Sequence, residues 1–210
     1  PPPRATLLAF FPTLQSAGDA VAAITATGLS PVTLELMDRF TIVAVDDMYD
    51  LGLDREAAAM LMVESDLPNI AADDELARAE SACLATGATS SVRSTNPAEA
   101  DMLRQARRMA HYALERLGDV KMEDIGVPRA RVPDMLREIE RIATRHGVRM
   151  GAFGHAGDGN LHPDLVLDRG DPNAEAITHA VQADLYQAAI DLGGTVTGEH
   201  GIGAARTAWL

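Results

Sequence analysis

The chain has 210 residues, a formal net charge of −13 and 47% hydrophobic residues, a composition able to bury a sizeable core. Its basic residues form no long cluster, so nucleic acid and anionic membrane surfaces are poor partners, since both require a positively charged face. No run of 18 or more apolar residues occurs, and the sequence therefore predicts no transmembrane helix.

The cysteine content bears on the cellular compartment, and the two chain ends bear on whether the sequence is part of a longer protein. The one cysteine, Cys83, excludes an internal disulfide and fits a reducing compartment, which favours the cytoplasm. The chain opens on three prolines without an initiator methionine, and it stops within AARTAWL (204–210), a pattern typical of the start of a helix. We therefore expect this to be a piece of a longer protein.

The first half of the chain alternates predicted strands and helices. The pattern predicts a strand at 5–11, a helix at 14–27, strands at 31–37 and 59–64, a helix at about 70–86 and a strand at 88–93. Residues 38–58 are ambiguous. The order β-α-β-β-α-β, over about 5–94, predicts an α+β fold of the ferredoxin-like kind, an antiparallel sheet with flanking helices.

The second half, residues 96–210, has clearer signals for where its helices begin and end. Asn96-Pro97-Ala98-Glu99 supplies an N-cap, a first-turn proline and a glutamate three residues after the cap. The predicted elements are a helix at 97–117, a strand at 121–127, a helix at 133–147, strands at 148–154 and 161–167, and a helix at 172–192.

Two histidines flank a glycine-rich stretch, GHAGDGNLHP (154–163). Asp158-Gly159 is typical of a two-residue hairpin turn, which would place His155 directly opposite His162 on one face of the hairpin. Opposed residues have Cβ atoms about 4.5–5.5 Å apart, so both imidazoles could reach one ion. A hydrogen-bonded polar pair without an ion is the alternative.

A second cluster, TGEHGIG, places Glu199 and His200 among several glycines in a segment that spans 193–203. Two imidazoles and a carboxylate suit Zn²⁺, Mn²⁺ or Fe²⁺, while a glycine-rich surface loop with incidental charges is the alternative. Because adjacent residues on extended or tightly turned segments point apart, we expect one of Glu199 and His200 to face away from such an ion.

The remaining polar motifs give weaker evidence of function. His111, His146 and His179 lie within helical patterns, where solvent-facing or structural roles are expected. Asp158 is expected to form the turn. No G-x-G-x-x-G fingerprint follows a strand, so the sequence predicts no nucleotide-binding Rossmann unit.

The two histidine motifs occur together with AFFPTLQSAGDAV, PVTLELMD, VES and EDIGVPRARVPDML. The set resembles the C-terminal region of FAD-linked oxidases of the vanillyl-alcohol oxidase type, nearest to the glycolate oxidase flavin subunits and the D-lactate dehydrogenases. The resemblance spans essentially the whole chain. It implies that residues 1–210 form the substrate or cap domain of an enzyme whose N-terminal FAD-binding domain is absent from this sequence.

The resemblance also implies roles for individual residues. His155, His162 and Glu199 fall on the family's metal ligands, and His200 on the base that takes the substrate hydroxyl proton while hydride passes to flavin. Arg107, with Arg108 as its competitor, would bind the substrate carboxylate. The residues that would meet the flavin are Asn160, Gly198 and Gly201.

What the resemblance implies for partners is a small 2-hydroxy acid, the chain's own FAD domain, and an electron-acceptor protein or quinone, which would make the full-length protein membrane-peripheral. Relatives acting on D-2-hydroxyglutarate carry a Lys where this chain has Met122 and a Thr where it has His111. A dicarboxylate is therefore disfavoured against lactate or glycolate. A free-standing metalloenzyme with two histidines and one carboxylate, and a non-catalytic ferredoxin-like binding module, remain alternatives.

Overall fold

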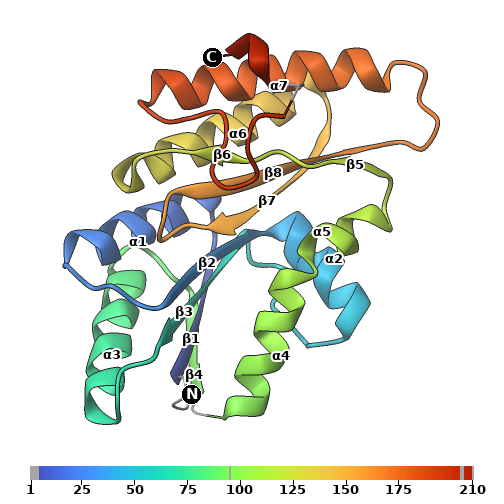
Figure 1. Ribbon diagram of the computed structural model, residues 1–210. Helices are drawn as coiled ribbons and strands as arrows, with labels where there is room; N and C mark the ends of the chain where they lie inside the picture. The colour runs from blue at the N-terminus through green and yellow to red at the C-terminus, as the bar shows by residue number, and fades with distance from the viewer. Residues whose placement is uncertain (1–4, 95, 204–205, 210) are drawn as a thin grey trace.

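The strands of both halves of the chain form one antiparallel sheet in the computed structural model (Figure 1). The structure describes residues 5–94, 96–203 and 206–209. The strands are β1 (Ala5–Phe11), β2 (Thr33–Asp38), β3 (Ala59–Ser65), β4 (Ser90–Ser94), β5 (Asp119–Lys121), β6 (Ile125–Gly126), β7 (Arg149–His155) and β8 (Asn160–Leu167). Their order is β4-β1-β3-β2-β7-β8-β5, and β6 also pairs with β8.

Helices cover both faces of this sheet (Figure 1). They are α1 (Leu14–Ala26), α2 (Arg39–Tyr49), α3 (Ile70–Ala85), α4 (Pro97–Arg108), α5 (Ala110–Glu115), α6 (Val132–His146) and α7 (Ala174–Asp191), with short 3-10 turns at Arg129–Arg131 and Thr207–Trp209. The ambiguous segment contains α2. The helix start expected in AARTAWL falls partly on residues 204, 205 and 210, which lie outside the described residues.

The predicted α+β class is confirmed, because β4-β1-β3-β2 is the antiparallel strand order of a ferredoxin-like sheet. Side-chain alternation along each strand feeds two separate cores. In β1, Leu7 and Ala9 contribute to the core with α1, α3, α6 and α7, whereas Phe10 contributes to the core with α2, α4 and α5. Since both faces are covered, β3 reads as a continuous apolar run rather than an alternating one.

The ferredoxin-like unit continues into the second half of the chain through the pairing of β2 with β7. In this register Glu35 lies directly across from His155, and Met37 across from Phe153. All four side chains belong to the face covered by α4 and α5. The hairpin histidines are thereby joined to a strand more than one hundred residues earlier in the chain.

Two predicted elements of the second half are wrong in detail. The helix expected over 97–117 is divided at Met109, whose φ of −93° and ψ of 7° leave the α-helical region. The break lets α5 pack on β5 and β8. The strand expected over 121–127 is two short strands, β5 and β6, separated by Met122–Asp124, so both can pair with β8.

The predicted two-residue turn at Asp158-Gly159 is also wrong. His155 pairs with Asn160 and Phe153 with His162, so the turn holds the four residues 156–159. The Gly157 N–H bonds to the Leu34 carbonyl of β2, which draws the longer turn onto the sheet. Because the register differs from the predicted one by two residues, both histidines still point to the same face.

No helix in the described part of the chain has the length and apolar character needed to cross a bilayer.

Gly159 should be the least replaceable glycine of the turn. Its φ is +78°, and a Cβ there would lie 2.0 Å from the Val127 carbonyl oxygen. Gly170 has a similar φ of +74° with open space around its Cβ position. We expect Gly170→Ala to lower the free energy of unfolding by about 1–2 kcal/mol, the cost of left-handed backbone in an L-residue. Gly159→Ala should cost about 1–3 kcal/mol more from overpacking. Urea unfolding of both variants checks this, and equal losses would contradict it.

Candidate active site

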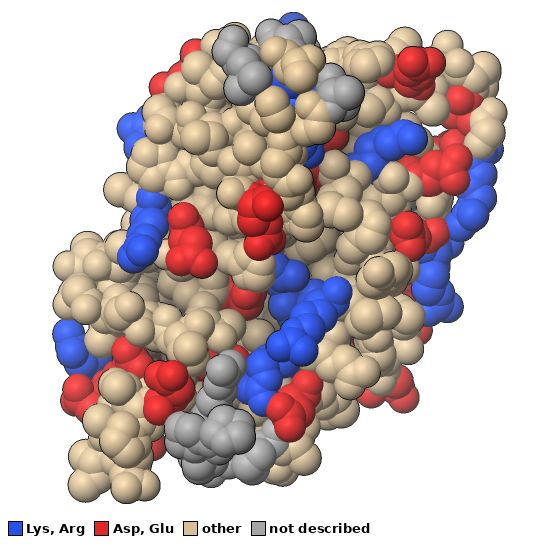
Figure 2. All heavy atoms as spheres, in the orientation of Figure 1, with Lys and Arg blue, Asp and Glu red and all other residues tan. Residues whose placement is uncertain are grey.

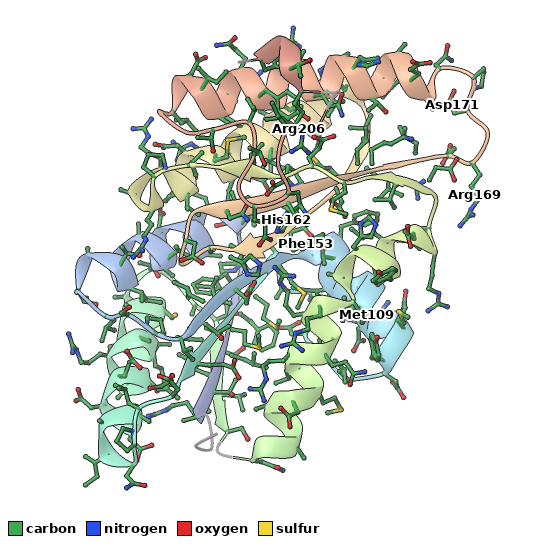
Figure 3. All side chains as sticks on the ribbon, viewed as in Figure 1. Met109, Phe153, His162, Arg169, Asp171 and Arg206 are labelled. Atoms are coloured by element: carbon green, nitrogen blue, oxygen red, sulfur yellow. The ribbon has the colours of Figure 1, made fainter. Side chains whose placement is uncertain are left out.

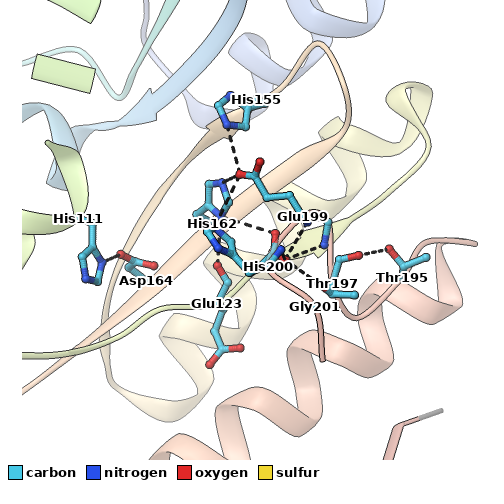
Figure 4. A network of polar contacts seen from close by, with 12 residues as sticks. His111, Glu123, His155, His162, Asp164, Thr195, Thr197, Glu199, His200 and Gly201 are labelled. Atoms are coloured by element: carbon cyan, nitrogen blue, oxygen red, sulfur yellow. Dashed lines mark hydrogen bonds and ion pairs between the residues drawn. The ribbon is translucent and has the colours of Figure 1, made fainter. Parts of the chain in front are cut away.

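Two histidines and a glutamate converge on the α4/α5 face of the sheet (Figure 4). Oε1 of Glu199 lies 3.4 Å from Nε2 of His155 and 3.4 Å from Nε2 of His162. These three side chains each offer one ligand atom within 4.8 Å of the others. The structure thus brings together the three residues that the sequence pattern selected as metal ligands.

The sheet fixes the two imidazoles at different depths. His162 is 5% exposed and packs against Phe153, its cross-strand neighbour, with ring centroids 5.6 Å apart (Figure 3). His155 stands at the end of β7 with its side chain 38% exposed. The two imidazole centroids are 5.8 Å apart. One imidazole of the site is therefore buried, and the other is partly exposed at its mouth.

Each of these histidines has its other ring nitrogen fixed by the protein. Nδ1 of His155 lies 2.6 Å from Oε1 of Glu35, and Nδ1 of His162 lies 3.3 Å from the carbonyl oxygen of Glu123. Carboxylates and carbonyls only accept hydrogen bonds, so in the neutral rings both Nδ1 atoms carry the proton and both Nε2 atoms are left as electron-pair donors. Metal-ligating histidines in proteins have this arrangement.

The two histidines titrate in opposite directions. The hydrogen bond to Glu35 raises the pKa of His155, against the opposing effects of burial and of Arg107. Burial lowers the pKa of His162, and the positive charge of Arg107 lowers it further. His162 is therefore neutral at neutral pH, the form in which imidazole binds metal.

Asp124 holds the glycine-rich loop against the sheet. Its Oδ2 accepts hydrogen bonds from the Thr197 hydroxyl at 2.7 Å and from the N–H groups of Gly198, Glu199 and His200 at 2.9, 3.0 and 2.8 Å. Burial alone would raise the pKa of Asp124, but these donors hold it below its usual range. The carboxylate is fully buried and ionised.

Glu199 and His200 lie closer together than the alternation of an extended segment predicts, although they fall in two different groups of potential metal ligands. His200 Nε2 lies 3.7 Å from Glu199 Oε1, and the His200 and His162 rings are 5.6 Å apart (Figure 4). The physical reason is that three successive amides converge on Asp124, so the segment curls and loses the alternation of an extended strand. Glu199 and His200 are both about half exposed.

A cavity opens beside His155, between α4 and β2. Its volume is about 180 Å³, and its lining residues are Thr33, Glu35, Met62, Arg104, Arg107, Arg108 and His155. Figure 2 shows basic side chains gathered over the position of α4 on this face. The cavity is therefore positively charged at its α4 wall.

The two arginines considered as carboxylate binders differ in their surroundings. Arg107 is 9% exposed, donates from Nε to Oε2 of Glu35 at 2.8 Å, and lies with its guanidinium carbon 5.1 Å from the Phe153 ring centroid. Its Nη2 is buried and forms an ion pair with the same Glu35 oxygen at 2.8 Å. Arg108 is exposed.

The residues expected to meet flavin are only partly brought together. Asn160 and Gly198 line one cavity of about 490 Å³ with His155 and Glu199, and a Cβ on Gly198 would lie 2.1 Å from Oδ1 of Asn160. That oxygen is buried without a hydrogen-bond partner among the described residues. Gly201 has a φ of +78° and does not line this cavity among the described residues.

The other three histidines pair with acids. His111 Nδ1 lies 2.6 Å from Oδ2 of the fully buried Asp164, and His146 Nε2 lies 2.8 Å from Asp184. The hydrogen bond to Asp164 raises the pKa of His111, despite the opposing effect of burial. His179 is 71% exposed.

Sequence reasoning missed Glu35, Glu123 and Asp124 as residues of the site. Glu35 sits in the alternating strand TLELMD on the face opposite to Leu34 and Leu36, and a glutamate on a covered face was the available signal. Glu123 and Asp124 are adjacent acids placed directly before β6. Their burial depends on α7 and on the glycine-rich loop, which no local pattern reveals.

Comparison with known proteins gives a consistent result. Over residues 1–210 the chain matches the protein family described as FAD linked oxidases, C-terminal domain. It is 36% identical over 212 residues to the glycolate oxidase subunit GlcD of Bacillus subtilis, covering 100% of this chain and 45% of that protein. It is 32% identical to GlcD of Escherichia coli K12, covering 97% and 41%, and 28% identical to a D-lactate dehydrogenase of Archaeoglobus fulgidus, covering 98% and 44%. The chain thus spans less than half the length of these relatives.

Solved structures share the fold at low sequence identity. A p-cresol methylhydroxylase matches with a TM-score of 0.68 and 13% identity, covering 93% of this chain and 45% of that one. A 4-ethylphenol oxidase from Gulosibacter chungangensis matches with a TM-score of 0.63 and 12% identity, covering 92% and 45%.

Replacing Glu35 should lower the pKa of His155. In Glu35→Gln the carboxylate that favours the imidazolium is lost while burial and Arg107 remain, so the pKa should fall to or below the usual value of about 6.5. Titration of the histidine ring protons by NMR, in the presence of chelator, measures it. Glu199→Gln is the matched control, and its smaller Coulombic effect should give a smaller fall; an equal or larger fall would contradict the assignment.

Proposed function

Because the chain belongs to the family of FAD linked oxidase C-terminal domains, we propose that it forms the substrate domain of a flavin-dependent 2-hydroxy-acid dehydrogenase. The proposed substrate is a small acid of the D-lactate or glycolate type. The observation that carries the proposal is the convergence of His155, His162 and Glu199 beside Arg107, with Glu35 contacting both His155 and Arg107.

The residues fit a divalent cation of the Zn²⁺, Mn²⁺ or Fe²⁺ type. Two imidazole nitrogens and one carboxylate oxygen are a donor set such ions accept, and each imidazole has the outer partner that fixes its orientation. When bound, the cation would lower the pKa of the substrate α-hydroxyl, and the flavin would accept the hydride. His155, His162 and Glu199 would hold the cation.

Arg107 supplies the carboxylate site in this proposal. Glu35 fixes the guanidinium through Nε, so its orientation is set before substrate arrives. Nη2 also lies 2.8 Å from Oε2 of Glu35, and the guanidinium N–H groups that Glu35 does not engage would donate to the substrate carboxylate. The carboxylate and the hydroxyl of the substrate would then lie on opposite sides of His155.

His200 is proposed as the general base. Its ring is half exposed and lies at the mouth of the site, 3.7 Å from Glu199. An imidazole can take a proton near neutral pH, which is the property that a general base needs. His200 would remove the hydroxyl proton while Arg107 holds the carboxylate.

Two residues of the chain, His111 and Met122, argue against a second carboxylate on the substrate. His111 is already paired with the buried Asp164, so its positive charge is balanced. Met122 offers no charge at all. Neither residue offers an unbalanced positive charge to a second carboxylate, which is why a small monocarboxylate is proposed.

The proposed partners follow from the span of the chain. Because it covers 45% and 41% of two glycolate oxidase subunits, we propose that a separate N-terminal domain binds most of the FAD. Asn160, Gly198 and Gly201 would contact the flavin from the substrate side. We further propose a cytoplasmic enzyme, membrane-peripheral where it passes electrons to a quinone or acceptor protein.

Substrate-driven flavin reduction tests the proposed function. In the intact protein, D-lactate or glycolate added without oxygen should bleach the flavin absorbance, and removal of metal by chelation should slow this at least about tenfold. His162→Ala should lose metal by elemental analysis, whereas the exposed His179→Ala should keep it. No bleaching with either acid would refute the function, and unchanged rates without metal would refute the metal's role.

The roles within Glu199-His200 can be separated. We expect His200→Asn to retain its metal and fold but to lose kcat by about 10²–10⁴-fold, the usual contribution of a general base. Its residual rate should rise with pH as hydroxide replaces the base. Glu199→Gln should instead lose metal. A His200→Asn enzyme that loses metal, or keeps the wild-type kcat, would show that the assignment is wrong.

A further inference from the structure

We propose that Asp124 is a positioning residue that sets the place of Glu199 and His200 in the site, and that Arg206 fixes the same loop from its other side. Neither residue is a ligand or a base. The inference rests on the proposed function, because it assigns a purpose to the position of those two side chains.

The contacts of Asp124 are concentrated on the segment that carries the chemistry. One oxygen, Oδ2, accepts the N–H groups of Gly198, Glu199 and His200 and the hydroxyl of Thr197, all within 3.0 Å. Hydrogen bonds to an ionised carboxylate are about twice as strong as neutral ones. A single buried charge thus fixes the backbone of both functional residues.

Arg206 holds the carbonyl side of the same loop. Its Nη1 lies 3.4 Å from the carbonyl oxygen of Val196 and 3.3 Å from that of Gly201. Arg206 is anchored in turn, because its Nε donates to the Tyr186 hydroxyl at 2.9 Å and its Nη2 lies 3.4 Å from Glu123 (Figure 3). The loop therefore lies between an acid that binds its amides and a guanidinium that faces its carbonyls.

The position of Asp124 follows from the alternation of residues before β6. Ile125 enters the core shared with α7 side chains, so Asp124 points to the opposite face, toward the imidazole of His162. Glu123 points back toward α7, where Tyr186 and Gln182 bond to it. Asp124 therefore contacts the amides of the loop directly, and Glu123 contacts Arg206, which faces the carbonyls of the loop.

Geometry argues against Asp124 as a metal ligand, although Asp124, His162 and His200 could be brought around one ion. Its Oδ2 already accepts four hydrogen bonds. Its Oδ1, which has no hydrogen-bond partner among the described residues, lies 3.8 Å from Nδ1 of His162, the nitrogen that donates to the Glu123 carbonyl. Binding an ion at Nδ1 would displace its proton and break the hydrogen bond to Glu123.

The loop needs these contacts from outside because its own glycine-rich sequence does not hold it in one conformation. Gly198, Gly201 and Gly203 leave the backbone many conformations, and fixing it costs more entropy than for other residues. Glu199 and His200 are each half exposed, so packing does little to hold them. Without Asp124 the carboxylate of Glu199 would not be kept at the two imidazoles.

Amide hydrogen exchange on the intact protein tests the inference without reference to metal or turnover. In Asp124→Ala, exchange in a peptide spanning 196–203 should accelerate at least tenfold, while a peptide from β3 stays protected. Asp124→Asn, whose amide oxygen can still accept hydrogen bonds, should restore part of the protection. Asp168→Asn, the same change at a side chain 88% exposed, should leave exchange unchanged.

Zinc titration and kinetics provide the second measurement. Zn²⁺ affinity should fall at least tenfold in Asp124→Ala and less in Asp124→Asn. kcat should fall while KM for the acid changes little, because the carboxylate site of Arg107 is untouched. Arg206→Met should give the same pattern, which covers the case that Asp124→Ala fails to fold.

Unchanged exchange in the folded variants would overturn the positioning role. Loss of Zn²⁺ from Asp124→Asn with unchanged loop exchange would also overturn it, since Asp124 would then be a ligand. A wild-type protein that neither binds Zn²⁺ nor oxidises the acids would refute the proposed function instead, and the exchange data would still report on Asp124.

Discussion

The pairing of β2 with β7 is the contact on which the site depends. It extends the ferredoxin-like sheet into the second half of the chain and sets Glu35 directly opposite His155. Opposed side chains on an antiparallel pair lie within contact distance, so the register alone delivers the carboxylate to the imidazole. A slip of one residue would turn every functional side chain of β7 to the other face of the sheet.

Buried charge is the second feature that organises the α4/α5 face of the sheet, where the site lies. Glu35, Glu64, Asp124 and Asp164 are all carboxylates with little or no exposure, and each has at least one hydrogen-bond donor or cation beside it. A buried carboxylate without partners would be costly enough to shift its pKa upward. The face therefore gains specificity of arrangement more than stability, because each charge admits few alternative partners.

Two different means hold the functional residues in place. Strands fix His155 and His162 through regular alternation, which needs no special contact beyond the correct register. The glycine-rich loop has no such regularity, and its residues are held by contacts to Asp124 and Arg206 from elsewhere in the chain. Loops positioned by a rigid scaffold commonly carry function for this reason.

The sequence by itself determined the local elements and the identity of the motif residues. Apolar spacing located most strands and helices and the ferredoxin-like order, and the two histidine motifs identified the family, because both signals are written in residues near one another. The turn of the hairpin was misjudged, since the bond from Gly157 to Leu34 competes with the local preference of Asp158-Gly159.

Only the tertiary structure decided which buried acids serve which residue. Glu35 reaches His155 across 120 positions of sequence, and Asp124 reaches His200 across 76. Such partners are chosen by strand register and by the path of the loop over the sheet edge. A lone glutamate or aspartate in a strand pattern carries no mark of its partner, because hydrogen bonding depends on proximity in space rather than on spacing along the chain.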